Sequence, residues 1–500
     1  MGKKMEKKIR FRNHISVVLE QLGAASWVVF VLLLTNVDDV VEFFENGTSE
    51  EINMTALIVG AVLFGILVLA CIYQLLLWSK TYISICDNSI VIERNTLHKK
   101  KNTIGIKNIS NVNTEQNLFE MFLGTCKVKL DTNSMSTADQ TDVKILLKKT
   151  DAEQLKSYIM KLMRQCKGEE EPVETQEVMV WNLEAQTKDM VKHGFLSINI
   201  FSVFIALGSF VGVVGIFMAT ASKISAGESL AGILLSVMMA AGMCISAIWD
   251  IVKGFIRYYG FKIARREDKL HICYGFFKKV DYTIPIEKIN GVILRQSFTA
   301  RITGQYMAEI INIGMGDDAA EAEAFLFPYC KKESVKVRLK QLLPELEHTV
   351  QMEYEKQPKE AWIAWLWPSF LYLLFAVFAT VAGVMYMPKY SKWMLTGAAL
   401  VSLWALLLVI AYYRTAGSRF GEEELLLVQG YFRKTYCFLP YRKIQYVELK
   451  QNFPAKLVRL QKGEIHLLAS ARNRIQNLPY FPEEDGEIIK ERIIQTTEVR

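Results

Sequence analysis

The chain has 500 residues, 51% of them hydrophobic, and a formal net charge of +7. This length would ordinarily indicate several domains, but the apolar fraction is high for a soluble protein. Because the positive charge lies on segments expected beside a membrane, the composition favours lipid over nucleic acid as a partner.

Apolar side chains are concentrated in six runs that contain no charged residue: 21–37, 52–79, 194–222, 229–249, 361–387 and 393–413. A helix of about 20 apolar residues crosses the hydrocarbon core of a bilayer, and five of the runs reach that length. The first run is shorter, so its helix must extend back past Glu20 to about Ile15. None of the runs shows the polar stripe of a helix on a soluble core. We therefore expect six membrane-spanning helices in three hairpins.

The charges beside these runs predict their orientation. Residues 1–14 contain six Lys or Arg and one Glu, whereas the loop 38–51 contains acidic charges only. Basic flanks stay in the cytoplasm, so we expect the N-terminus, the C-terminus and the three long polar segments to be cytoplasmic. The basic start lacks the features of a cleaved signal peptide, so the first helix is expected to remain.

A repeated unit follows each apolar hairpin. Residues 78–130, 258–310 and 413–465 align without a gap, at offsets of 180 and then 155. In the aligned segments Gly275 matches Gly430 and Asn95. The block Ile-x-x-Val-x-x-x-Gln occurs in all three and ends at Gln116, Gln296 and Gln451. A repeat of this length defines a structural module, here present three times.

The second copy shows the expected secondary structure best. Strands are predicted at Lys269–Cys273, Val280–Ile284, Ile289–Leu294 and Met307–Ile313, with a tight turn at Gly275 that uses a positive φ. Each copy ends in a predicted amphipathic helix, over 152–163 in the first copy, 335–343 in the second and 488–493 in the third. Antiparallel strands capped by one helix fit a small barrel plugged by that helix.

These elements resemble the bacterial membrane-flanked domain family, whose cytoplasmic module is a bacterial pleckstrin-homology (PH)-like domain. The resemblance is carried by the hairpin, the Gly and basic turn, and the Pro285 or Pro440 that precedes the Ile block. It covers essentially the whole chain, although the first copy departs most, with Asn95 and Gly105 at the Gly and Pro positions. It implies no catalytic residues, and a one-copy paralogous membrane protein as a partner.

We therefore expect an α+β membrane protein with six transmembrane helices in three hairpins, each followed by a cytoplasmic PH-like split β-barrel capped by a C-terminal helix. The expected boundaries are hairpins at 1–79, 194–257 and 361–413, PH-like domains at 80–166, 258–347 and 414–500, and a linker at 167–193. The acidic part of this linker, 168–177, has no apolar pattern and should be flexible.

The basic turn tips are the candidate residues for binding lipid or a partner protein. They are Lys99, Lys100 and Lys101 in the first copy, Phe276, Phe277, Lys278 and Lys279 in the second, and Tyr431, Phe432, Arg433 and Lys434 in the third. A cation beside an anionic leaflet contributes about 1 kcal/mol, and neighbouring aromatic rings can enter the interface. The alternative is that these are solvated turns that follow the general basic bias of cytoplasmic loops.

Other residue patterns favour structure over chemistry. The three repeated Gln side chains are expected to make structural hydrogen bonds to the backbone. The six His lack the spacing of a zinc site, and no phosphate-binding loop or nucleophile motif occurs. We therefore expect no catalytic residue, metal or cofactor. The eight Cys form no C-x-x-C pair and are expected to be free and mostly buried.

The first hypothesis for function is a non-enzymatic membrane scaffold or envelope-maintenance protein that presents three PH-like domains at the cytoplasmic leaflet. Its expected partners are anionic membrane lipids, a one-copy paralogous protein or a second copy of the chain, and not nucleic acid. Two alternatives stay open: a transporter or channel component, as an auxiliary subunit, and a lipid-acting enzyme. Against transport, no apolar run has an ionisable residue at its centre.

Overall fold

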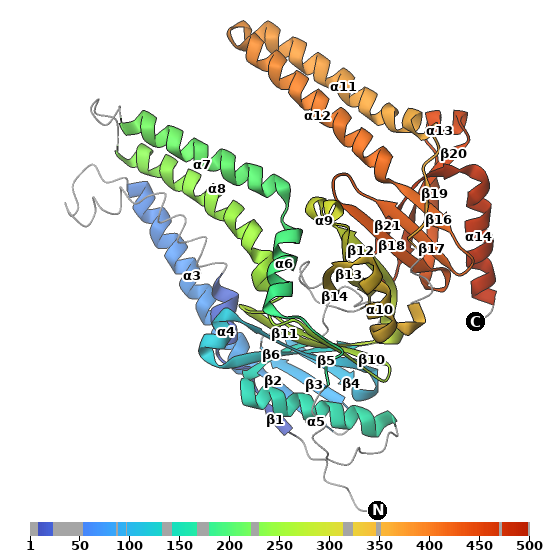
Figure 1. The fold of residues 1–500 in the computed structure, drawn as a ribbon. Coiled ribbons are helices and arrows are strands. Elements are labelled where there is room, and N and C mark those ends of the chain that lie inside the picture. Colours follow the sequence, from blue (N-terminus) through green and yellow to red (C-terminus); the bar gives the residue numbers. More distant parts are fainter. Residues whose placement is uncertain are drawn as a thin grey trace, which may run out of the picture. The chain divides into compact units, whose positions relative to one another are not determined.

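The computed structural model describes residues 9–23, 54–86, 89–96, 98–132, 143–167, 180–221, 230–313, 324–346, 352–469 and 473–498. The chain divides into two compact units. Unit 1 comprises Met1–Ser134, Thr141–Glu177 and Lys278–Tyr282, and unit 2 comprises Met135–Gln140, Val178–Phe277 and Thr283–Arg500. In both units, long helices join antiparallel sheets, as Figure 1 shows. The acidic part of the expected linker, 168–177, lies outside the described residues.

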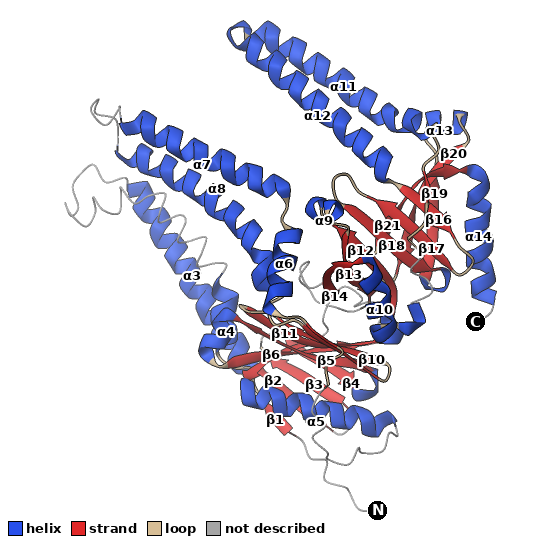
Figure 2. Cartoon of the chain, viewed as in Figure 1, coloured by secondary structure: helices blue, strands red, loops and turns tan. Residues whose placement is uncertain are grey.

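Five of the six apolar runs fall on described helices. These are α3 (Met54–Lys80), α7 (Ile200–Ala221), α8 (Leu230–Arg257), α11 (Ala361–Tyr386) and α12 (Ser391–Thr415). Most of the run 21–37 lies outside the described residues. In unit 2, α7 packs beside α8 and α11 beside α12, each pair forming a helical hairpin (Figure 2).

Length and composition allow two or three of the described helical segments to cross a membrane. Ala361–Tyr386 and Pro388–Thr415 each qualify, and none of their most apolar stretch is buried inside the protein. A third span is obtained if α6 (Thr187–Ser197) and the start of α7, which bend by 74°, are counted together. The protein therefore has an α+β architecture with apolar helices beside its sheets.

Unit 1 contains two antiparallel sheets and a closing helix. The first sheet has the order β1-β2-β3-β4, formed by Ile9–Phe11, Thr81–Cys86, Ser89–Asn95 and Lys99–Gly105. The second has the order β7-β6-β5-β11, formed by Val143–Lys148, Thr125–Thr132, Ile109–Asn117 and the start of Lys278–Pro285. Helix α5 (Lys149–Lys167) packs against both sheets, because Ile159 is fully buried in one core with Ile90 and Val128 from the two sheets. Unit 1 therefore has the predicted antiparallel sheets and the predicted helix after them.

Unit 2 repeats this arrangement. Its larger sheet has the order β14-β13-β12-β18-β17-β16-β15, and a three-stranded sheet has the order β19-β20-β21. In that order the seven strands are Ala324–Lys331, Gln305–Asn312, Ile289–Gln296, Lys434–Pro440, Glu424–Gln429, Gly417–Phe420 and Glu355–Lys356. The three are Ile444–Lys450, Leu460–Leu467 and Ile475–Pro482. β8 (Leu183–Glu184), β9 (Lys262–Arg266) and β10 (Lys269–Tyr274) also pair in this unit.

Short helices complete the modules. A helical turn follows each Gln block: α4 (Leu118–Leu123), α9 (Phe298–Ile302) and α13 (Phe453–Leu457). The closing helices of the second and third modules are α10 (Lys332–Leu342) and α14 (Glu483–Glu498). In each module the expected amphipathic helix is therefore present at the expected place.

Successive modules share strands, which the sequence analysis does not predict. β12 of the second module pairs with β18 of the third, with Gln296 opposite Lys434. β5 of the first module pairs in the same antiparallel way with the start of β11, with Gln116 opposite Lys279. Under the alignment offsets these two registers are identical. The second sheet of one module therefore continues into a strand of the next.

Each module also begins before its apolar hairpin. The short strands β1, β8 and β15 precede the hairpins in sequence and pair with β2, β9 and β16, which follow them. Within the range expected to be linker, 167–193, the structure places β8 and the first part of α6. The hairpins α7–α8 and α11–α12 are thus insertions between the first and second strands of their sheets, and in the first module α3 lies between β1 and β2 in the sequence.

The expectation that the Cys are mostly buried is wrong. All eight Cys are free, but only Cys126, Cys330 and Cys437 are buried. In α14, Ile489 is buried whereas Ile488 is exposed, because only one face of this helix meets the core.

The backbone conformation at one turn of the repeat leads to a testable prediction. Gly124, Gly304 and Arg459 occupy aligned positions, and their φ values are 66°, 62° and 51°. A side chain in this left-handed region costs about 1–2 kcal/mol. We therefore expect Arg459→Gly to raise the free energy of unfolding of the third module by roughly 1 kcal/mol. Thermal unfolding of the full chain in detergent measures this, and a lower melting temperature would contradict it.

Candidate anion-binding site

The tip of the first strand hairpin in the third module, residues 430–433, lies against α12. Thr415 near the end of this helix donates a hydrogen bond to the carbonyl of Gly430. The rings of Tyr412 and Tyr431 lie 5.1 Å apart, and Phe432 stacks on Trp404 at 6.0 Å. The expected aromatic tip is therefore held beside the apolar hairpin.

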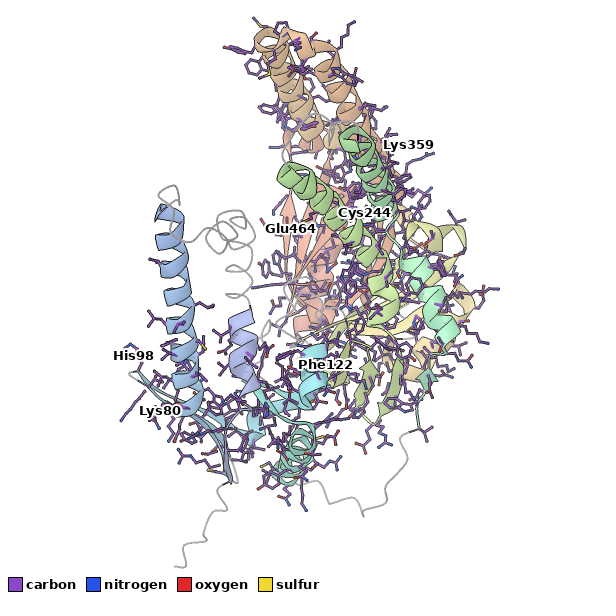
Figure 3. All side chains as sticks on the ribbon, turned by 90° about the vertical axis from the view of Figure 1, so that its left-hand side faces the viewer. Lys80, His98, Phe122, Cys244, Lys359 and Glu464 are labelled. Atoms are coloured by element: carbon purple, nitrogen blue, oxygen red, sulfur yellow. The ribbon has the colours of Figure 1, made fainter. Side chains whose placement is uncertain are left out.

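The corresponding tips of the other modules also lie near the end of an apolar helix. In the second module the amide of Gly275 donates to the carbonyl of Tyr259 at 2.7 Å, and the half-exposed ring of Phe276 lies 5.3 Å from Tyr259. In the first module β3 contacts α3, and Figure 3 shows His98 at the tip of this hairpin beside the helix that ends at Lys80. The turn glycines, Gly275 and Gly430, have the expected positive φ, whereas Asn95 does not.

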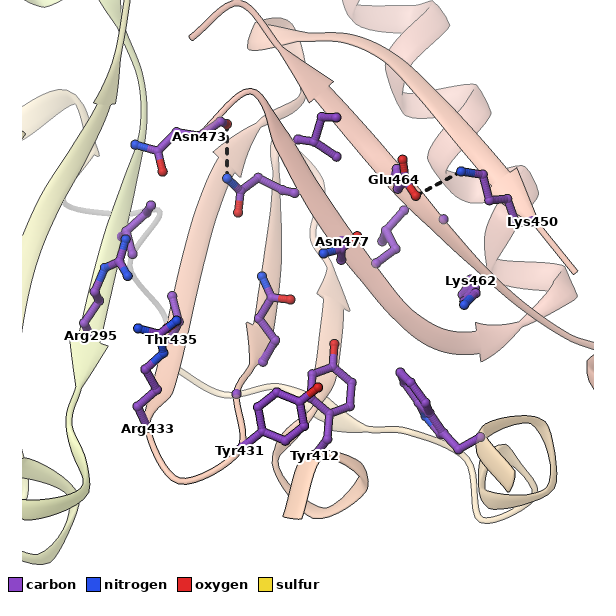
Figure 4. Close-up of a pocket in the computed structure, with 18 residues that line it drawn as sticks. Arg295, Tyr412, Tyr431, Arg433, Thr435, Lys450, Lys462, Glu464, Asn473 and Asn477 are labelled. Atoms are coloured by element: carbon purple, nitrogen blue, oxygen red, sulfur yellow. Dashed lines mark hydrogen bonds and ion pairs between the residues drawn. The ribbon is translucent and has the colours of Figure 1, made fainter. Parts of the chain in front are cut away.

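A cavity of about 520 Å³ lies between the two sheets of the third module and the ends of α11 and α12. Its lining includes Trp365 from α11. Tyr412 from α12 and Tyr431 from the tip lie side by side in the same lining (Figure 4). The opposite walls come from β12, β18 and the sheet β19-β20-β21. The site is therefore built from the third module, its apolar hairpin and one strand of the second module.

Cations outnumber carboxylates in the lining of this cavity. Arg295, Arg433, Lys450 and Lys462 face a single carboxylate, that of Glu464. Lys450 pairs with Glu464 at 2.9 Å, and Arg295 pairs with Glu309 at 2.7 Å. Arg433, which Figure 4 labels among the lining side chains, is exposed.

The fourth cation, Lys462, lies on aromatic rings. Its ammonium is 5.8 Å from the ring centre of Trp365 and 5.6 Å from that of Tyr480. A cation over aromatic faces is stabilised there without a carboxylate partner. Together with Arg433 it gives the cavity a positive character suited to an anion.

Only two of the expected tip residues of the third module line this cavity. Tyr431 and Arg433 do, whereas Phe432 stacks on α12. Lys434 turns into the protein, where it donates a hydrogen bond to the hydroxyl of Tyr354 at 2.8 Å and lies 4.6 Å from the ring of Tyr436. Burial, assisted by nearby cations, lowers the pKa of Lys434 to about 8. Lys434 is therefore a structural residue of the shared sheet.

The expected residues of the other tips are also divided between structure and surface. Lys278 forms an ion pair of 2.7 Å with Glu115 on β5, while Lys279 is exposed. Phe277 is half-buried and lies 5.0 Å from Phe276. In the first module Lys99, Lys100 and Lys101 are all exposed, and Lys101 lies 3.6 Å from Glu93.

The three repeated Gln side chains make the same structural hydrogen bond. The side-chain amides of Gln116, Gln296 and Gln451 donate to the carbonyls of Thr125, Gln305 and Leu460, each nine residues further on. This bond ties the end of the Gln-block strand to the next strand across the short helix. It is a backbone contact of the kind the repeat led us to expect.

Several lining residues of the cavity could not be predicted from the sequence. Lys450 and Lys462 align with Glu115 and Lys127 in the first copy and with Arg295 and Met307 in the second. Since the copies differ at these positions, the repeat gives no signal there. Only Trp365, one of three Trp near the start of its apolar run, has a recognisable signal, that of an interfacial aromatic residue.

The structure also brings His466 beside two carboxylates. Ligand atoms of Glu448, Glu464 and His466 lie within 4.8 Å of one another, which is close enough to hold a metal ion. Lys450, however, pairs with both carboxylates, at 3.3 Å and 2.9 Å. The ammonium therefore already balances the charge that would attract a cation, and we assign no metal to this cluster.

These features define a class: a membrane protein in which PH-like modules with two antiparallel sheets and a closing helix alternate with apolar hairpins. The chain belongs to the bacterial PH domain family, whose model matches residues 28–163, 202–345 and 369–497. It is similar to the UPF0699 transmembrane protein YdbT of Bacillus subtilis strain 168, with 22% identity over 453 residues that cover 87% of this chain and 90% of that protein. No solved structure matches the chain.

Proposed function

We propose that the protein is a non-enzymatic, multi-pass membrane scaffold whose third module binds the anionic headgroup of a lipid in its cationic cavity. The observation that carries this proposal is the position of the cavity. Trp365 and Tyr412, at the ends of two helices able to cross a membrane, share its lining with Arg433 and Lys462. Cations at the end of a membrane-spanning helix meet headgroup phosphates, and Trp and Tyr are favoured at the same membrane–water interface.

The basic flanks support a topology in which six helices span the membrane and the three modules lie in the cytoplasm. The cytoplasmic leaflet carries the anionic lipids, so this orientation faces the cationic cavity toward its proposed ligand. Three modules on one chain would each make weak contacts with the leaflet, and their linkage would strengthen overall retention. In this proposal the chain holds partners at the membrane and catalyses no reaction.

Neutralising two cavity cations tests the headgroup site. We expect Arg433→Gln with Lys462→Gln to weaken binding of dioctanoyl-phosphatidylglycerol by about 2 kcal/mol, or roughly 30-fold, because each cation contributes about 1 kcal/mol. Binding of dioctanoyl-phosphatidylcholine should not change. The full chain in non-ionic detergent is titrated with each lipid, and tryptophan fluorescence reports binding at the Trp365 wall.

The matched control removes two cations of the same module that do not line the cavity. Arg442 and Lys490 are both exposed, and the variant Arg442→Gln with Lys490→Gln should bind phosphatidylglycerol as the wild type does. Glycerol 1-phosphate, added alone, separates recognition of a free phosphate from recognition of a lipid. Equal phosphatidylglycerol binding by the two double variants would overturn the proposed site.

A further inference from the structure

Two strands of the repeat have one unpaired edge in the described part of the chain. β4, at the start of the first module, pairs with β3 on one side only, and β19, in the third module, pairs with β20 on one side only. An open edge exposes a row of backbone donors and acceptors that can pair with another strand. These edges lie at opposite ends of the series of modules.

We call the pairings of β5 with β11 and of β12 with β18 the internal joints of the chain. These joints show which strand each open edge lacks. By alignment β19 corresponds to β5 and β12, and β4 corresponds to β11 and β18. Each β5-type strand inside the chain pairs with the β4-type strand of the following module. β19 therefore lacks a strand of the β4 type, and β4 lacks a strand of the β19 type.

Aligned side chains are buried where a second strand pairs with the edge and exposed where the edge is open. The repeated Gln is 9% exposed in β5 and 5% exposed in β12, where a neighbouring strand covers it, whereas Gln451 after β19 is exposed. Ile293 in β12 is 2% exposed, but its aligned counterpart in β19, Glu448, is exposed. These positions are covered at the joints and open in the third module.

The same contrast holds on the other open edge. Tyr282 and Cys437, in the paired strands β11 and β18, are 2% and 0% exposed, whereas their counterpart in β4, Asn102, is exposed. The open edges carry Asn102 and Glu448 where the joint of β12 and β18 carries Cys437 and Ile293. A joint between them would therefore be more polar than that internal joint, and so more easily reversed.

One residue pair recurs at both internal joints and fixes the expected register. Gln116 lies opposite Lys279, and Gln296 lies opposite Lys434. The aligned residues on the open edges are Gln451 and Lys99. Lysine at a strand edge ordinarily discourages pairing with unrelated strands, yet here the joints themselves place a lysine at this position. Lys99 is therefore compatible with a joint of this type.

We propose that β19 of one chain pairs antiparallel with β4 of a second copy, with Gln451 opposite Lys99 and Glu448 opposite Asn102. The contact repeats the internal joint between chains, so the same type of sheet continues from one molecule to the next. Because the two surfaces differ, the association is head to tail and builds a row or a closed ring of chains. This proposal does not depend on lipid binding.

Cysteine cross-linking of the full chain in membranes tests the pairing. A chain with Asn102→Cys and a differently tagged chain with Glu448→Cys are co-expressed and treated with a mild oxidant. We expect a disulfide-linked dimer that carries both tags, because opposite residues of paired strands lie within the reach of a disulfide. The eight native Cys are present in every sample, so each single variant expressed alone gives the background.

The control moves one cysteine to the opposite edge of the same three-stranded sheet. Ile475 at the start of β21 is 44% exposed, and Asn102→Cys combined with Ile475→Cys should give no more dimer than background. Absence of the mixed-tag dimer from the Asn102→Cys and Glu448→Cys pair would overturn the proposal, provided that both variants retain wild-type thermal unfolding. A cross-link that forms only to a different protein would also overturn it.

Discussion

Gly430→Ala is expected to unfold the tip of the third module. With φ at 139°, Gly430 adopts a backbone conformation that other residues rarely reach. A Cβ atom at this position would lie 2.0 Å from the backbone carbonyl oxygen of Arg433. This oxygen belongs to the turn itself, so no side-chain rotation can relieve the clash. The turn must open, at a cost of about 3 kcal/mol or more from strain and overpacking.

The loss of this turn should also disrupt the cationic cavity. Gly430 accepts the hydrogen bond of Thr415, and the turn it forms places Tyr431 and Arg433 in the lining. Hydrogen exchange of the full chain in detergent measures the effect locally. Amides of β17 and β18 should exchange roughly 100-fold faster, since about 3 kcal/mol of local stability corresponds to that factor.

Gly304→Ala is the matched control. Gly304 also has a positive φ, of 62°, but no atom lies within 4 Å of the Cβ it would gain. The cost should be limited to the conformational term of about 1–2 kcal/mol, and the effect should stay in the second module. The prediction is wrong if Gly430→Ala speeds exchange in β17 and β18 no more than Gly304→Ala speeds exchange around α9. The backbone of the turn would then be able to move away from the added Cβ atom at little cost.

The sequence predicts the secondary structure of each module much better than the contacts between modules. The strands of the second copy follow from alternation and turn residues, and β10, β11, β12 and β13 begin within two residues of the expected positions. The closing helices follow from apolar spacing, as the burial of Leu339 shows. These signals are local, and local patterns are sufficient for elements of this kind.

Pairing between modules leaves no such signal. Alternation in β12 is the same whether its outer edge meets water or another strand, so Ile293 gives no indication that it lies under the third module. Charge predicts the tip residues as candidates for binding, yet charge alone cannot distinguish Arg433, which lines the cavity, from Lys434, which turns inward. Adjacent residues of a strand face opposite sides, and the sequence does not tell which side is the cavity.

A buried charge cluster lies where β5 of the first module pairs with β11 of the second, and the sequence gives no sign of it. Removing the carboxylate of this cluster should strongly destabilise unit 1. Glu115 on β5 is 5% exposed and forms ion pairs with Lys129 on β6 and Lys278 on β11. The side chain of Lys129 is only 9% exposed. Glu115→Leu would leave this ammonium buried without the carboxylate that it pairs with, and such a loss costs about 3–5 kcal/mol.

Thermal unfolding of the full chain in detergent measures this effect, and two further variants identify its cause. Lys101→Met removes the exposed pair with Glu93, in which the Lys101 side chain is 65% exposed, and should change stability by less than about 1 kcal/mol. Combining Glu115→Leu with Lys129→Met should recover most of the lost stability, because an apolar pair of similar volume replaces a buried charge pair at little cost. Lys278 can turn toward water, since it is 35% exposed, and so needs no compensating change. If the double variant were no more stable than Glu115→Leu alone, the loss would instead come from disrupted packing of β5 against its neighbours.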